Sequence, residues 1–126
     1  MRDTIKNHND FHTTDSDPSA RSEYFFVRAK PARFPDNPRV GFMVTKRVFK
    51  LAVHRNRAKR LMRDWVQFNL DLMVPEFDYI FTARSPIINA DRETGRLAMM
   101  RALTHILKKY APKTPKNLAK IIKHSA

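Results

Sequence analysis

The chain has 126 residues, with 25 lysines and arginines against 12 aspartates and glutamates and a formal net charge of +13. A hydrophobic content of 42% allows one packed core, and the absence of cysteine excludes disulfides, a thiol nucleophile and a cysteine zinc site. No stretch reaches the roughly 18 apolar residues of a membrane span, and the first 25 residues lack the apolar segment of a signal peptide. We therefore expect a soluble, cytoplasmic protein whose partner is a polyanion, either nucleic acid or an anionic membrane surface.

A polar N-terminal region precedes two β-prone segments. Residues 1–21 are mostly polar and predict a short helix at most. Residues 23–29 are rich in aromatic and β-branched side chains and predict a strand that Pro31 ends. Residues 40–45 predict a second strand, so the two strands could pair as a hairpin with a long connection.

Apolar residues recur at helical spacing over residues 51–72. The face that we expect to pack against a sheet carries Leu61, Trp65, Phe68 and Leu72. Pro75 ends this helix, and residues 78–83 predict a third strand.

A second helix follows, with Asn89 or Asp91 as its N-cap and Pro112 at its end. Its predicted buried face carries Leu97, Met100, Leu103, Leu107 and Tyr110. The order of helix, strand, strand, long helix, strand and helix fits a small α+β sandwich with helices on a sheet. We expect residues 1–112 to form this single domain and residues 113–126 to be a basic extension, weakly amphipathic or disordered.

The positive charge is concentrated around the start of the long helix. Eight cations lie within 18 residues that contain no acidic side chain: Lys46, Arg47, Lys50, Arg55, Arg57, Lys59, Arg60 and Arg63. On a helix, one arc opposite the apolar face would hold Arg55, Asn56, Lys59, Arg60, Arg63 and Gln67. A charged helix face is usually only solvated, but a face of one sign costs repulsion and favours binding to RNA phosphates. Arg57 lies at the edge of the apolar face near Asp64, so a structural role and an RNA contact are both open.

Other kinds of site have weaker support in the sequence. A nuclease acting alone would need clustered carboxylates or a histidine acid and base, whereas the acidic residues here are dispersed. His8 and His12 have the spacing of a helical metal pair but lack a third ligand, so we expect surface histidines.

The segment from Arg39 to Trp65 resembles the signature of the bacterial ribonuclease P protein subunit. That signature is an Arg-Val/Ile-Gly strand, a Lys-Lys/Arg step and Arg-Asn-Arg-x-[Lys/Arg]-Arg on the next helix. The matching residues are Arg39, Val40, Gly41, Lys46, Arg47, Arg55, Asn56, Arg57, Lys59, Arg60 and Arg63. A weaker similarity extends over residues 5–110.

The resemblance implies a two-layer α+β sandwich on a roughly four-stranded sheet with a left-handed βαβ crossover. It implies a protein subunit of an endonuclease that removes the 5′ leader of precursor tRNA. The protein would bind the catalytic RNA through Lys46, Arg47 and the Arg-Asn-Arg helix, and the RNA would hold the Mg²⁺ that drives hydrolysis. The protein itself would contribute no catalytic residue.

The resemblance also implies a leader cleft lined by Phe11, Phe26 and Arg28, since aromatic rings stack on unpaired bases and arginine holds phosphates. Ordinary core packing is the alternative for both phenylalanines. The chain departs from the family pattern at Thr14 and Asp15, which would end the first helix early.

A second departure concerns the loop before the basic helix, where Phe49 stands at a position that is often Gly in the family. This loop is expected to differ locally. A generic basic RNA-binding or ribosome-associated protein is the alternative function, because it would share every compositional feature of this chain.

Overall fold

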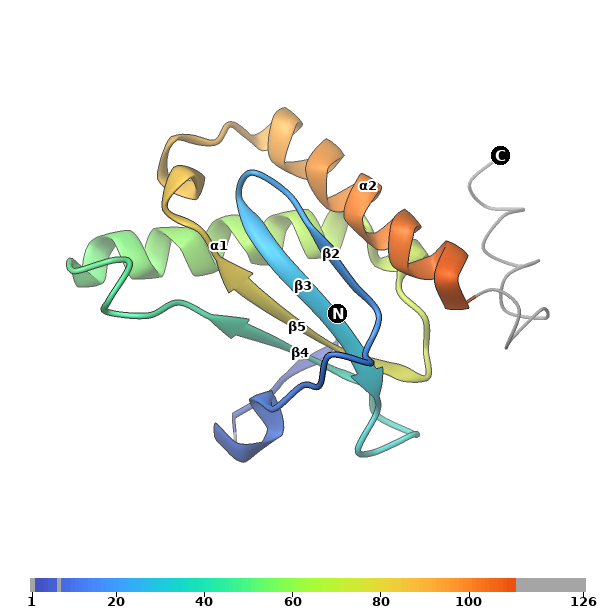
Figure 1. Ribbon diagram of the computed structural model, residues 1–126. Helices are drawn as coiled ribbons and strands as arrows, with labels where there is room; N and C mark the ends of the chain where they lie inside the picture. The colour runs from blue at the N-terminus through green and yellow to red at the C-terminus, as the bar shows by residue number, and fades with distance from the viewer. Residues whose placement is uncertain (1, 7, 111–126) are drawn as a thin grey trace.

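The computed structural model describes residues 2–6 and 8–110 (Figure 1). Its strands are β1 (Asp3–Thr4), β2 (Ser19–Arg21), β3 (Phe25–Pro31), β4 (Arg39–Met43) and β5 (Phe77–Ala83). Its α-helices are α1 (Ala52–Phe68) and α2 (Arg92–Tyr110), and three 3₁₀ turns are η1 (His8–Phe11), η2 (Leu70–Leu72) and η3 (Ser85–Asn89). The mixed α+β architecture agrees with the prediction. No helix in this part of the chain is long and apolar enough to cross a membrane.

The five strands form one mixed sheet in the order β1-β4-β5-β3-β2. The predicted hairpin is wrong, because β5 lies between the two strands and pairs parallel to β4 and antiparallel to β3. Six of the seven β5 residues are buried, and such a strand is stable at the centre of a sheet with partners on both sides. The sequence pattern predicted three strands and the family resemblance implied about four. The strands that the pattern did not predict, β1 and β2, are short edge strands without an apolar run.

The parallel strands β4 and β5 are joined through α1. In Figure 1 both strands run from right to left, α1 passes behind the sheet and β5 lies above β4. Followed along the chain, this path turns with a left hand, as the family resemblance implied. The crossover brings the start of α1 next to the end of β4, so the basic residues of loop and helix are contiguous in space.

The sheet-facing side of α1 is centred on a different arc from the predicted one. Trp65 is fully buried as expected, but its buried neighbours are Ala58, Met62 and Val66. Phe68 has 62% of its surface exposed, because α1 ends there and the chain turns into η2. The helix is therefore rotated about its own axis relative to the prediction. The side that faces the sheet is centred on Met62 and Val66.

The N-terminus of α2 is capped by Asp91, one of the two predicted residues. Its carboxylate accepts hydrogen bonds from the Thr94 backbone N (2.7 Å) and hydroxyl (3.0 Å), and these bonds lower the pKa of Asp91. The buried residues of α2 include Met99, Ala102, Leu103, Ile106 and Leu107. Leu97 and Met100 are instead about two-fifths exposed, so their predicted burial is wrong. The side chain of Tyr110 and residues 111–126, with the predicted extension, lie outside the described residues.

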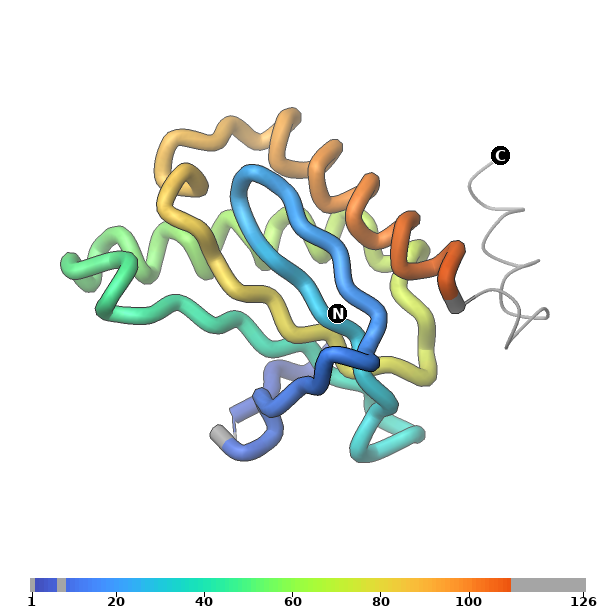
Figure 2. The backbone as a smooth tube through the Cα atoms, viewed as in Figure 1, coloured from blue at the N-terminus to red at the C-terminus, as the bar shows by residue number. Residues whose placement is uncertain are grey.

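The two faces of the sheet have different roles. Alternate residues of β3 and β5, including Phe25, Val27 and Phe81, face α1 and form the core. We call the opposite surface of the sheet the open face. The N-terminal segment crosses this face in front of the sheet, while α1 lies behind it (Figure 2).

Candidate nucleic-acid interface

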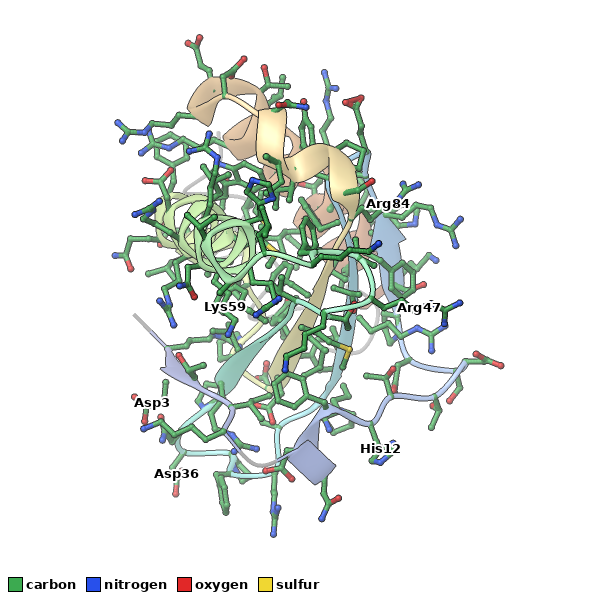
Figure 3. All side chains as sticks on the ribbon, turned by 90° about the vertical axis from the view of Figure 1, so that its left-hand side faces the viewer. Asp3, His12, Asp36, Arg47, Lys59 and Arg84 are labelled. Atoms are coloured by element: carbon green, nitrogen blue, oxygen red, sulfur yellow. The ribbon has the colours of Figure 1, made fainter. Side chains whose placement is uncertain are left out.

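The basic surface predicted from the sequence is formed by the loop after β4 and the outer side of α1. Figure 3 looks along α1 from its N-terminal end and shows Lys59 on the helix and Arg47 on the loop. Exposed members of the set are Lys46, Arg47, Lys50, Asn56, Arg57, Arg60 and Arg63, while Arg55 and Lys59 are half-buried. In the described part of the chain, none of the eight cations pairs with a carboxylate.

The start of α1 adds to this positive surface. Leu51 stands at the N-cap and provides no side-chain hydrogen bond, and the first turn contains no acidic residue. The free N–H groups of a helix N-terminus carry a partial positive charge of roughly half a unit. The dipole and the neighbouring Lys50 therefore both give this end of α1 a positive potential that favours anions.

Arg55 is directed to the protein's own loop. Its Nη1 donates hydrogen bonds to the carbonyl oxygens of Phe49 (2.7 Å) and Lys50 (3.1 Å). Phe49 is buried, and its backbone N donates to the Thr45 carbonyl at 2.9 Å. Arg55 and Phe49 thus fasten the loop that displays Lys46 and the neighbouring cations.

Arg57 connects α1 to η3. Its Nε donates to the Ile88 carbonyl oxygen at 3.1 Å, while its side chain remains exposed. Asp64 does not pair with it, because Asp64 binds Arg96 at 3.1 Å and lies 3.9 Å from Arg92. Arg57 therefore has a structural role, which was one of the two roles that the sequence left open for it.

The predicted leader residues lie on the open face. Phe26 is half-buried, with the guanidinium of Arg28 5.2 Å and that of Arg21 5.6 Å from its ring centroid. Arg84 shares a hollow of about 310 Å³ with Phe26 and Arg21. The Phe26 ring thus lies against two guanidinium groups on the open face. Its neighbour Phe25 is instead part of the core between the sheet and α1.

Phe11 ends the turn η1 and packs on β4. A Cβ atom built on Gly41 would lie 2.6 Å from Cε1 of Phe11, so this glycine allows the ring to rest on the backbone of the sheet. The predicted first helix is one 3₁₀ turn, and no helix continues through Thr14 and Asp15. The expected early end of the helix is therefore confirmed.

Two cations on β3 hold the N-terminal segment against the open face. Arg28 donates to the Thr14 carbonyl (3.1 Å) and pairs with Asp15 at 3.3 Å. Lys30 donates to the carbonyl oxygens of His12 (3.0 Å) and Asp10. Sequence reasoning missed Arg21, Lys30 and Arg84. The two-residue period of β3, which places Phe26, Arg28 and Lys30 on one face, would have indicated Lys30.

An ion-pair network with buried Asp10, Arg39 and Asp78 and exposed Arg33 anchors η1 at the start of β4 and β5. Asp10 binds Arg33 at 2.6 Å and Arg39 at 3.1 Å, and Arg39 lies 3.4 Å from the fully buried Asp78. Burial alone would raise the pKa of Asp10, but the hydrogen bonds and charges of Arg33 and Arg39 outweigh it and hold the pKa below its ordinary value. The network fixes the position of the N-terminal segment relative to the sheet.

The described residues contain no group of three or more His, Asp or Glu that could hold a metal ion. His12 is exposed, and the side chain of His8 is outside the described set.

Comparison with known proteins gives a consistent family assignment. The family model described as Ribonuclease P matches residues 1–110. The ribonuclease P protein component of Lactobacillus delbrueckii subsp. bulgaricus is 31% identical over 115 residues, covering 89% of this chain and 95% of the relative. The Pseudomonas putida protein component is 47% identical over 49 residues, covering 39% of this chain and 36% of the relative.

Solved structures show the same fold. The Staphylococcus aureus RNase P protein superposes with a TM-score of 0.63 at 23% identity, covering 80% of this chain and 92% of that chain. The Thermotoga maritima RNase P protein gives a TM-score of 0.57 at 24% identity, covering 68% and 80%. The fold, the basic helix and these matches agree, and the chain therefore belongs to the ribonuclease P protein family, the protein component of the ribonuclease of tRNA 5′ processing.

Proposed function

We propose that this protein binds the ribonuclease P RNA through the outer side of α1 and the loop before it, and holds the 5′ leader of precursor tRNA on the open face of the sheet. The observation that supports the first part most strongly is the surface of one charge sign, whose eight cations lack carboxylate partners in the described part of the chain. When the cations of this surface neutralise RNA phosphates, the counterions condensed on the RNA are released, and this release favours complex formation.

The contacts in this surface suggest a division of labour. Lys46, Arg47, Asn56, Arg60 and Arg63 are exposed and would contact the RNA directly. Lys59 is half-buried and would contribute at the edge of the surface. Arg55 and Arg57 bind carbonyl groups of the protein, so their main contribution would be to position the loop and η3.

Support for the leader site comes from the open face. Phe26 offers a ring on which an unpaired base can stack, and Arg21, Arg28 and Arg84 surround it with donors for phosphate oxygens. Phe11 lies on the same face over Gly41. A single strand would fit here better than a duplex, because only unpaired bases expose their faces for stacking.

Hydrolysis of the phosphodiester bond would take place at the RNA, with Mg²⁺ held there. The protein's residues would bind and orient: the cations of α1 fix the two subunits relative to each other, and the open face holds the leader. We place this particle in the cytoplasm, in accord with the function in tRNA processing.

The test is cleavage of a precursor tRNA by a bacterial ribonuclease P RNA at low Mg²⁺, with and without this protein. We expect stimulation that is lost when Arg60 and Arg63 are both replaced by Ala, because the two subunits then bind weakly. An Arg101→Ala variant, which removes an exposed charge from α2, serves as the matched control. A folded protein that binds RNA without stimulating cleavage would support the generic RNA-binding function instead.

A further inference from the structure

A second hollow, of about 740 Å³, lies beside the N-terminal segment. Its lining includes Arg2, Lys6, Asp10, Arg33, Phe34 and Arg39. Asp3, which also lines it, and His12 lie on opposite sides of η1 in Figure 3. The hollow is therefore separate from the contacts that Arg28 makes with the segment after η1.

Phe34 is the central feature of this hollow. It lies in the loop between β3 and β4, and 49% of its surface is exposed. The guanidinium carbons of Arg39 and Arg33 lie 5.0 and 5.4 Å from its ring centroid. Both arginines are themselves held by Asp10, so the ring has a fixed cationic frame.

The charge of the lining suits an anionic ligand. The lining carries four cations, Arg2, Lys6, Arg33 and Arg39, against the two carboxylates of Asp3 and Asp10. Arg2 donates to the carbonyl oxygens of Val74 and Phe77, whereas Arg33 and Arg39 pair with Asp10. Lys6 is exposed and pairs with no carboxylate in the described part of the chain. The Nε of Arg39 is buried and has no hydrogen-bond partner among the described residues. The two guanidinium groups lie over the ring, and the exposed part of Phe34 remains for a base. An aromatic surface with cations beside it is the arrangement that binds the base and phosphate of an unpaired nucleotide.

We propose that this Phe34 pocket binds one unpaired nucleotide of an RNA strand, with the base stacked on Phe34 and the phosphate held by Lys6 and Arg33. The proposal rests on the function proposed above in taking RNA as the ligand. The pocket adjoins the leader site, because Arg39 and Gly41 lie on the same face of β4, about 7 Å apart along the strand. It would thus receive a leader nucleotide beyond those bound near Phe11 and Phe26.

The experiment measures the affinity of the reconstituted holoenzyme for precursor tRNAs whose leaders are lengthened one nucleotide at a time. For the wild type we expect affinity to rise again when the leader becomes long enough to reach the pocket. Phe34→Ala and Phe34→Leu should both lose this last increment, about tenfold, because neither side chain can stack. Phe34→Tyr should retain it.

The matched control is Phe68→Ala. Phe68 is also exposed, and the guanidinium carbon of Arg96 lies 4.2 Å from its ring centroid, but it is on α1 and does not line the pocket. This variant should keep the wild-type dependence on leader length. Equal melting temperatures of Phe34→Ala and wild type would show that the loss is local.

A photo-crosslink separates the pocket from the leader proposal. A short single-stranded RNA carrying 4-thiouridine should crosslink to the peptide containing Phe34 in the protein alone. If the last increment is retained in Phe34→Ala, the pocket proposal is wrong and the leader function stands. If the wild type shows no dependence on leader length, the leader function is wrong, and the crosslink then decides the pocket: its presence supports a nucleotide site and its absence overturns it.

Discussion

Both glycines of the chain lie beneath an aromatic ring, and the freedom of that ring to move decides what each position tolerates. Gly95 on α2 lies under the ring of Trp65, which is fully buried. Gly41 on β4 lies under Phe11, which is half-buried at the end of a short turn. A methyl group added at Gly95 should therefore disturb the core, whereas one added at Gly41 should disturb the proposed leader site.

Gly95→Ala should lower the free energy of unfolding by about 1–2 kcal/mol. Alanine gains about 1 kcal/mol of helix propensity over glycine. Its Cβ would lie 2.0 Å from Cε2 of Trp65, however, and forcing extra volume into a packed core typically costs about 1–3 kcal/mol, here at the upper end. Urea denaturation measures the difference. A variant as stable as the wild type would contradict the close contact between α2 and Trp65.

Gly41→Ala is the informative counterpart. Phe11 can move outward, so we expect a stability change below about 1 kcal/mol. The displaced ring should weaken binding of precursor tRNA while leaving binding of mature tRNA unchanged. Unchanged binding of the precursor would argue against a role of Phe11 in the leader site.

At the scale of elements, α1 serves two purposes on opposite sides. Its inner side is buried around Trp65, while its outer side carries exposed Arg60 and Arg63. The loop before α1 is held by Arg55 and by the buried Phe49. Substitution of the exposed Arg60 or Arg63 should therefore affect RNA binding in a different way from substitution of Arg55, which holds the loop.

Arg60→Ala and Arg63→Ala should each weaken binding to the ribonuclease P RNA. Each substitution should also reduce the slope of log K against log salt concentration by about one, because about one phosphate neutralisation is lost. The measurement is a series of binding titrations at different salt concentrations, with Arg101→Ala as control. An unchanged slope in both variants would exclude this side of α1 from the interface.

Arg55→Ala should show another pattern. The loop loses two hydrogen bonds to carbonyl groups, so its cations are presented in more conformations, and affinity should fall through faster dissociation. Amide hydrogen exchange in residues 45–50 should increase in the free protein. If exchange is unchanged and only the salt slope falls, Arg55 contacts the RNA directly and does not position the loop.

At the scale of the whole molecule, the Asp10 network joins the N-terminal segment to the start of two central strands. Four chain regions meet here: η1, the loop before β4, β4 itself and β5, which contribute Asp10, Arg33, Arg39 and Asp78 respectively. The network encloses one side of the Phe34 pocket and fixes the segment that crosses the open face. Its loss should therefore affect stability and RNA binding together.

Acid should weaken this network in a defined direction. The pKa of Asp10 is lowered in the folded protein, so its stabilising contribution is complete above the unfolded value of about 3.9 and is lost as pH falls through the lower folded value. In that window the unfolded chain binds more protons than the folded chain, so stability falls as the pH falls. Asp10→Asn should flatten the dependence of melting temperature on pH below about 4. Asp91 also has a lowered pKa, so Asp91→Asn is the control that measures how much Asp91 contributes to the pH dependence of the melting temperature.

The family, the basic surface and the main elements could be read from the amino-acid sequence, because each of them depends on contiguous residues. A run of cations without acids is visible from the chain alone, and so are the strands near Phe26 and Tyr79 and the period of α1. The placement of β3, α1, β5 and α2 was predicted to within a few residues. Local periodicity and proline positions carry this information.

Tertiary structure decided the rest, since it depends on residues far apart in the chain. The position of β5 between β3 and β4 follows from burial on both faces, which no pair of adjacent segments reveals. The orientation of α1 follows from where the sheet and Gly95 contact Trp65, and Phe68 is exposed because α1 ends there and the chain turns into η2. The frame around Phe34 exists only because Asp10 brings Arg33 and Arg39 together, and long-range ion pairs of this kind leave no periodic signal in the sequence.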